Sequence, residues 1–329
     1  MTTVTNRVRR FTQNHILIMK NIFLTLATVF AFACETEITP KLNAPAEIIV
    51  VDAWVNQKME PQKIRITRSQ PYFEQSIPKK IPGAHVVIED LNSGEIYEFQ
   101  EEAESYFWYP TDQPFGKVGH QYKLTVTVDD QEFEAFSLMG RVPPIDSIIF
   151  HYNPKDMIVK KEYYTAEFVA SDPAGAGDAY WIKAWKNGAF LGNPGELNMA
   201  YDAGFSAGQP VDGQEFIIPI RKDFMNPYDP HPEKANELLP PYEVGDSLYV
   251  EIHSLDHLAF DFLYGLYFQI ARPGGFAELF SMPLANTSTN IYPVGDEDTP
   301  VTGFFNTSAV SSRGLKLSEE LAKASMKEH

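Results

Sequence analysis

The sequence predicts a mainly β protein with two folded domains. The first is an antiparallel β-sandwich over residues 47–142, and the second is a β-rich domain over residues 145–317 that contains one amphipathic helix. Apolar and polar residues alternate along many short segments, as in strands with one buried and one exposed face. Turn-forming residues separate these segments at regular intervals, which is typical of antiparallel sandwiches. Pro143 and Pro144 can neither donate to a sheet ladder nor continue a helix, so they mark the domain boundary.

The strands of the first domain follow from this alternation. A turn at residues 90–94, rich in residues that tolerate positive φ, separates two of them and predicts a hairpin. Residues 129–131 join a second hairpin pair. We expect strands at residues 48–55, 63–68, 85–89, 95–99, 122–128 and 132–136.

The second domain combines further strands with one helix. Apolar residues recur at spacings of three and four behind Ser254, the expected N-cap, which predicts a helix near residues 255–271. Phe260, Tyr264 and Phe268 lie off this apolar stripe, so the helix is either buried between layers or offers an aromatic edge to a partner, and we favour burial. The expected strands are residues 147–151, 164–169, 180–185 and 247–253, and residues 318–329 are an expected polar tail.

The only cysteine, Cys34, follows a short apolar run at residues 22–33. The run suits the core of a signal peptide and is shorter than the ~20 residues of a membrane-spanning helix. Ala31-Phe32-Ala33-Cys34 resembles a bacterial lipobox, in which the signal peptidase cuts before a lipidated cysteine. We therefore expect Cys34 to be lipidated; the alternative is a buried free cysteine.

This leader sets the expected ends of the mature chain. Residues 1–33 are an expected upstream extension plus lipoprotein signal peptide, with translation starting at Met19. Residues 34–46 are polar and interrupted by prolines, as in a tether between a lipid and a folded body. Glu35 and Glu37 resemble the surface-export signal of Bacteroidota lipoproteins, which favours the cell surface over the periplasmic face.

The charge of the chain excludes one class of partner. The formal net charge is −17, and removal of the basic leader would make it more negative. A chain this acidic repels phosphates, so we expect no nucleic-acid partner.

The order of the segments resembles a family of Bacteroidota lipoproteins, the domain-of-unknown-function family numbered 4249. The resemblance covers almost the whole chain behind the lipobox and begins with Val-Val-Asp-Ala-Trp-Val at residues 50–55. It continues through residues 69–73, 83–90, 119–126, 143–148, 290–292, 301–305 and 308–310. The resemblance implies an outer-membrane lipoprotein with an immunoglobulin-like first domain that works beside TonB-dependent transporters. It implies no active site.

A search for catalytic motifs finds little in the sequence. The chain has no P-loop, G-x-G-x-x-G turn, H-E-x-x-H helix or G-x-S-x-G elbow, so we expect no catalytic residue, no cofactor and no metal. His253, Asp256 and His257 are weak metal candidates. Their alternative role is structural, with Asp256 near a helix start where a negative charge is favourable.

Two further groups of residues are candidates for contact or modification. Aromatic side chains can stack on sugars or pack against a partner, so Tyr106, Trp108, Tyr109 and Phe115 are possible contact residues. Ser147 and Ser247 lie in Asp-Ser-aliphatic tripeptides that resemble a Bacteroidota O-glycosylation site.

These observations predict a lipid-anchored, non-enzymatic outer-membrane protein. The leading hypothesis is a binding or assembly accessory of a TonB-dependent nutrient transporter. The alternative is an independent surface lipoprotein that binds a glycan or peptide. A hydrolase that uses His253 and nearby carboxylates is a more distant alternative.

Overall fold

The computed structural model describes residues 47–328, apart from Tyr72, Phe73, Gln75, Pro273, Met282 and Leu284. The described part is mainly β, as the alternation predicts, and all the strands named above are present with small shifts at their ends. Cys34 and the rest of the leader and tether lie outside the described residues, so their expected roles stay predictions. Within the described ranges no helix is long and apolar enough to cross a membrane.

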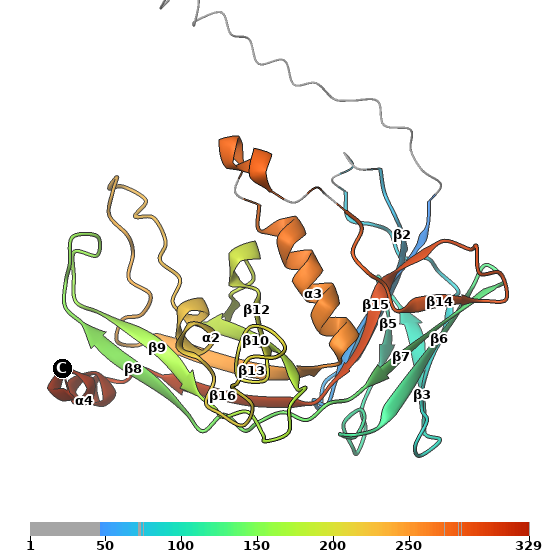
Figure 1. Ribbon diagram of the computed structural model, residues 1–329, viewed down its shortest axis with the longest axis horizontal. Helices are drawn as coiled ribbons and strands as arrows, with labels where there is room; N and C mark the ends of the chain where they lie inside the picture. Colours follow the sequence, from blue (N-terminus) through green and yellow to red (C-terminus); the bar gives the residue numbers. More distant parts are fainter. Residues whose placement is uncertain are drawn as a thin grey trace, which may run out of the picture. The chain divides into compact units, whose positions relative to one another are not determined.

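The largest sheet has nine strands in the order β14-β7-β6-β3-β4-β5-β2-β1-β15 (Figure 1). The two ends of the sheet approach each other, so it is nearly closed into a barrel. The edge strand β15 packs beside β14 and β7 at the opposite end, and the Ser137 hydroxyl in β7 lies 3.1 Å from the Thr307 hydroxyl in β15. The strands are β1 (Ile49–Asn56), β2 (Gln62–Arg68), β3 (His85–Asp90), β4 (Ile96–Glu102), β5 (Ser105–Trp108), β6 (Gln121–Val128), β7 (Gln131–Leu138), β14 (Ile291–Val294) and β15 (Val301–Ser308).

Asn290 closes the seam between the two edges of this sheet. Its side-chain amide donates to the carbonyl of Phe305 at 2.8 Å and to that of Phe136 at 3.3 Å. Its side-chain oxygen accepts from the Phe305 amide at 2.9 Å, and the residue is 1% exposed. One buried amide side chain therefore satisfies backbone groups of both edges.

Strand β15 pairs in parallel with β1, although the two are far apart in sequence. Gly303 lies opposite Val51 with φ +109°, a value that non-glycine residues rarely adopt. A Cβ at this position would lie 1.9 Å from the Val51 carbonyl oxygen. The close approach of the two strands therefore requires glycine.

Two smaller sheets and several short helices make up the rest of the described chain. The five-stranded sheet runs β11-β10-β13-β16, with β12 also pairing β10, and β8 pairs β9. Tyr180 and Ile182 from β10 and Val250 and Ile252 from β13 are buried in one core cluster. The strands are β8 (Ser147–Asn153), β9 (Tyr163–Val169), β10 (Ala179–Lys186), β11 (Ala189–Phe190), β12 (Asn198–Tyr201), β13 (Ser247–Leu255) and β16 (Val310–Lys316). The short helices are η1 (Pro194–Glu196), α2 (Ile218–Lys222), η2 (Asp223–Met225) and η3 (Gly275–Phe280).

The expected polar tail forms a helix, α4 (Glu319–Glu328), which packs on β8. Ala322 is buried in the core cluster of the five-stranded sheet, and the Ser325 hydroxyl accepts from the Tyr152 amide at 2.8 Å. The segment is amphipathic, and a small apolar residue on its inner face is enough to dock it.

Helix α3 (His257–Ile270) confirms the predicted helix with two corrections. Its N-cap is Asp256, whose carboxylate accepts from the Ala259 amide at 2.7 Å, whereas Ser254 lies within β13. Ala259, Phe260 and Leu263 are buried, but Leu258, Tyr264 and Phe268 are 53%, 46% and 39% exposed. Full burial between layers is therefore wrong, because the helix covers a sheet with one face and leaves an aromatic face open.

Candidate functional site

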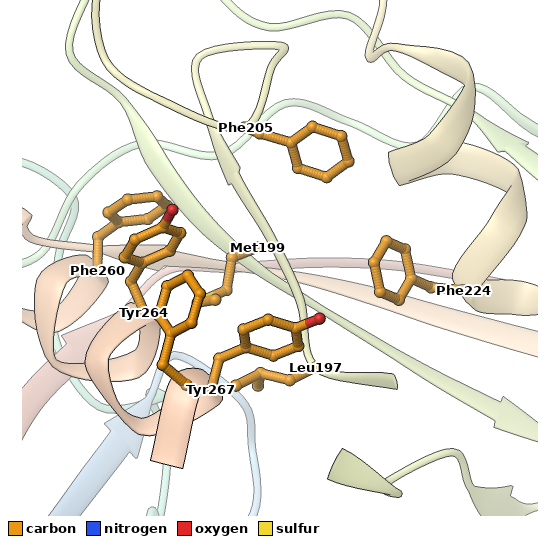
Figure 2. A pocket seen from close by; sticks show the side chains of 8 residues that line it. Leu197, Met199, Phe205, Phe224, Phe260, Tyr264 and Tyr267 are labelled. Carbon is orange, nitrogen blue, oxygen red and sulfur yellow. The ribbon is translucent and has the colours of Figure 1, made fainter. Parts of the chain in front are cut away.

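An apolar pocket of about 270 Å³ lies along α3, and we call it the α3 pocket (Figure 2). Every lining side chain is aliphatic or aromatic, and none carries a formal charge. The lining residues are Leu197, Met199, Phe205, Phe224, Phe260, Tyr264, Tyr267 and Phe268. Concave apolar pockets of this kind are the usual form of small-molecule sites.

One wall of the pocket is a ladder of aromatic rings on α3. Phe260 stacks on Tyr264 at 6.0 Å between ring centroids, and Tyr264 meets Phe268 edge to face at 4.9 Å. These residues are four apart, the spacing at which side chains are neighbours on a helix. Tyr267 meets Phe268 at 5.5 Å, so the wall is held by its own ring contacts.

The facing wall and the floor come from residues 197–224, which run from just before β12 into η2. Figure 2 shows Phe205 and Phe224 across the hollow from the helix, with Met199 between the walls. The side-chain amide of Asn198 donates to the backbone carbonyl of Ile220 at 2.7 Å, which connects β12 to α2. Asn226, directly after η2, exchanges two hydrogen bonds with the backbone of Ala166 in β9. These buried amides fix the backbone that positions Phe224.

A second apolar hollow of about 190 Å³ lies on another side of α3. Leu263, Leu266 and Ile270 of the helix face Trp181 and Phe190 there. The carboxyl-terminal half of α3 is thus flanked by apolar hollows, which extends the apolar surface around the pocket.

The four predicted contact residues lie on β5 or shortly after it, and none lines the α3 pocket. Tyr106 and Phe115 are fully buried in the core of the nine-stranded sheet, where the Tyr106 hydroxyl donates to the Ile81 carbonyl at 2.6 Å. Trp108 is half-buried and packs edge to face on Tyr97. Tyr109 is 48% exposed, and its hydroxyl donates to Glu102 at 2.8 Å. Of the four residues, Tyr109 has the most accessible ring.

The weak metal candidates are not brought together. Asp256 caps α3, His257 is exposed with Nδ1 3.1 Å from the Tyr201 hydroxyl, and His253 is buried with Nε2 2.8 Å from Glu251. Each side chain therefore has a different structural neighbour.

His253 belongs to a buried polar network on β13. Glu251 accepts from His253 at 2.8 Å, from Lys58 at 2.7 Å and from the Tyr249 hydroxyl at 2.9 Å. Burial would raise the pKa of Glu251, but the hydrogen bonds from His253 and Lys58 outweigh it and lower the pKa to about 2. Burial lowers the pKa of His253 to about 4, against the opposing effect of Glu251. At neutral pH the network thus holds a carboxylate and an uncharged imidazole.

Lys183 lies beside this network on β10. Its ammonium lies 3.9 Å from the centroid of the Trp181 ring, a cation–π geometry. Burial lowers the pKa of Lys183 to about 8, which Glu251 partly opposes. This lysine is therefore more easily deprotonated than an ordinary one.

Among the described residues, one group of acidic side chains gathers closely. Carboxylate oxygens of Asp172, Asp202 and Asp212 lie within 4.8 Å of one another. Asp172 accepts from the Tyr180 hydroxyl at 2.6 Å, and Asp202 accepts from the Gly177 amide at 2.7 Å. These bonds fasten the loop after β9, and this structural role accounts for the cluster.

Ser147 and Ser247 are half-buried first residues of β8 and β13. The Ser247 amide donates to the side-chain oxygen of Asn187 at 2.8 Å. Both serines are therefore only partly accessible at the starts of their strands.

The sequence pattern indicated only the residues that α3 contributes to the pocket. Phe260, Tyr264 and Phe268 stood out because they lay off the helical stripe. Leu197 and Phe205 lie outside regular elements and Phe224 lies in the short helix η2, so none has a periodic pattern, and their contact with α3 depends on tertiary packing. An isolated aromatic residue in a glycine-rich loop is the only signal that could have indicated Phe205.

The fold and the site define a class, a mainly β protein with an uncharged aromatic pocket beside a half-exposed helix. The family model described as "Domain of unknown function (DUF4249)" matches residues 35–314. The chain belongs to this family, as the order of its sequence segments predicted. No curated protein matches the chain.

Proposed function

We propose that this protein is a lipid-anchored, non-enzymatic binding protein of the outer membrane that acts as an accessory of a TonB-dependent nutrient transporter. The observation that carries the proposal is the α3 pocket, whose aromatic walls come from α3 and from the segment between β12 and η2. Such walls supply contact area for a ligand but offer no carboxylate, imidazole or thiol for catalysis. The half-exposed α3 beside the pocket supports a role in contact with a second molecule.

The membrane anchor in this proposal is Cys34. It is supported by the lipobox-like sequence, and the acidic Glu35 and Glu37 support an outward-facing position on the cell surface. In cell fractionation, the wild-type chain is expected in the outer membrane, and Cys34→Ala is expected to be missing from that fraction because it is neither lipidated nor cleaved. The anchor is wrong if Cys34→Ala stays in the membrane and the wild-type protein carries no acyl mass.

The transporter partnership is tested by a pull-down from the native outer membrane. The tagged full-length protein is recovered in mild detergent, with Cys34→Ala as the control, and co-purified proteins are identified by mass spectrometry. A TonB-dependent transporter at near-equal amount is the expected result. Recovery of the lipoprotein alone overturns the accessory role.

One observation favours the alternative, an independent surface lipoprotein that binds a glycan or peptide. Tyr109 presents an exposed aromatic ring away from the α3 pocket, as sugar-stacking residues do. This alternative requires binding to a soluble glycan without any transporter, and Tyr109→Ala should abolish it.

The half-buried Ser147 and Ser247 are proposed sites of O-glycosylation, and an unchanged intact mass of the mature protein would exclude that modification.

We also propose that residues 47–142 form an immunoglobulin-like domain to which β14 and β15 are added. The pairings β1-β2-β5-β4 and β3-β6-β7 support this, because they follow the A-B-E-D and C-F-G orders of an immunoglobulin domain. β4 also pairs β3 and so links the two groups. A fragment that joins residues 47–142 through a flexible linker to residues 290–308, so that β1 keeps its partner β15, would count against an independent domain if it gave no cooperative unfolding transition.

A further inference from the structure

We infer that the α3 pocket binds an uncharged organic molecule that carries a compact ring system and a hydrogen-bonding substituent. The inference rests on the proposed binding function and names the ligand class of the same pocket. It follows from the volume of the pocket and from the ring contacts, the charge and the tyrosine hydroxyls of its lining residues.

The aromatic rings of the two walls differ in their contacts with other rings. The α3 rings contact one another, but Phe205 and Phe224 contact no other aromatic ring in the part of the chain that the structure describes. Aromatic rings gain free energy from stacked or edge-to-face contacts with a second ring. A ligand ring between the walls would contact both, and Met199 would add a polarisable sulfur from the floor.

The volume limits the size of the ligand. The pocket of about 270 Å³ lies just below the usual range for small-molecule sites, about 300–1,000 Å³. A compact ring system fits such a volume, whereas an oligosaccharide or a long acyl chain would extend beyond it.

The lining also limits the charge of the ligand. An anion would lose hydration without meeting a cationic side chain, and the net charge of −17 would repel it. A cation would meet ring faces, but no carboxylate among the lining residues would pair with its charge and replace its hydration. An uncharged ligand avoids both costs.

Two lining residues provide polar groups. The hydroxyls of Tyr264 and Tyr267 form no hydrogen bond with any other described residue. Each can donate one hydrogen bond and accept others, so a ligand with an amine, hydroxyl or carbonyl group would satisfy them. These hydroxyls would orient a ring that the apolar walls hold.

The test uses two dyes that share one ring framework. N-phenyl-1-naphthylamine is uncharged, and 8-anilinonaphthalene-1-sulfonate adds an anionic sulfonate. Both are titrated by fluorescence into the expected mature chain, residues 34–329 with Cys34→Ala, so that no apolar leader, acyl chain or detergent binds the dye. We expect the uncharged dye to bind with one saturable site, at least about tenfold more tightly than the sulfonate.

Variants locate the site. Phe268→Ala on α3 and Phe205→Ala on the facing wall should each raise the Kd of the uncharged dye about 3- to 10-fold. Leu258→Ala is the matched control, because Leu258 is exposed on the same helix but does not line the pocket. Both pocket residues are partly exposed, and Phe205 lies outside α3, so a loss in both variants cannot come from unfolding of the helix.

Three results would overturn the inference: no binding of the uncharged dye, equal affinity for the sulfonate, or pocket variants that behave like Leu258→Ala. None of them changes the transporter pull-down. Failure of the ligand class and failure of the proposed function are therefore distinguishable.

Discussion

Lys58, in the connection between β1 and β2, forms an ion pair with Glu251 of β13 at 2.7 Å, and Glu251 is buried. The pair connects the nine-stranded sheet to the five-stranded sheet. His253 adds a second hydrogen bond to the same carboxylate. This contact between sheets contains groups with shifted pKa values, so it predicts a pH dependence of stability.

Acidification should destabilise the protein through His253. The pKa of His253 is about 4 in the folded protein, below its ordinary value of 6.5. Between these values the unfolded chain binds more protons, so stability falls as pH decreases from about 6.5 to about 4, by at most about 3 kcal/mol. Urea unfolding of His253→Gln across this range should show a flatter profile than the wild type.

The matched control for this prediction is His257→Gln, because His257 is exposed. It should leave the wild-type profile unchanged. An equally steep profile in His253→Gln would show that another group causes the loss. Below pH 4, protonation of Glu251, with its pKa of about 2, should destabilise both variants further.

Asp256 should behave as a helix cap. Asp256→Ala should lower the free energy of unfolding by about 1 kcal/mol, because the Ala259 amide loses its acceptor. Asp256→Asn should stay within a few tenths of a kcal/mol of the wild type, since asparagine caps helices nearly as well. Chemical denaturation measures both, and equal losses would contradict the capping role.

The strands could be predicted well because most have one buried and one exposed face. Such strands show a direct alternation of apolar and polar residues in the sequence. In β6, for example, Tyr122, Leu124, Val126 and Val128 are buried and alternate with partly or fully exposed residues. The expected strands of both domains rest on patterns within single segments, and the structure confirms them.

Contacts between distant segments could not be predicted in this way. Nothing local in residues 301–308 indicates a parallel partner at β1. The capping residue of α3 was misplaced because β13 continues through Leu255, and tertiary pairing overrode the local preference of Ser254. Only the α3 side of the pocket was predicted for the same reason, since Phe205 lies in a loop and Phe224 in the short helix η2, and tertiary packing brings both to the pocket.

Gly265 offers a way to stabilise α3. It lies within the helix, and a Cβ added there would meet no atom within 4 Å. Gly265→Ala should raise the free energy of unfolding by about 0.5–1 kcal/mol, because alanine loses less backbone entropy in a helix. Thermal unfolding tests this, and a lower melting temperature would contradict the open space at Gly265.

Asn290 should be critical for closing the nine-stranded sheet. Asn290→Ala removes partners from the buried amide and carbonyl of Phe305, and each unsatisfied group costs about 1–3 kcal/mol. The free energy of unfolding should fall by at least about 2 kcal/mol. Asn286→Ala, at an exposed position in the same segment, should have almost no effect. Equal small effects of both changes would show that the seam does not depend on Asn290.

The parallel pairing of β1 with β15 has a consequence for the order of folding. Among the described strands β1 comes first and β15 comes near the end, so one edge of β1 stays unpaired until residues 301–308 have been made and, in an exported chain, translocated. An open strand edge is a template for association with other chains. The high sequence separation of the pair also predicts slow final folding. Residues 301–308 therefore act as a late-arriving strand, and a chain truncated before them would expose the edge of β1 and aggregate.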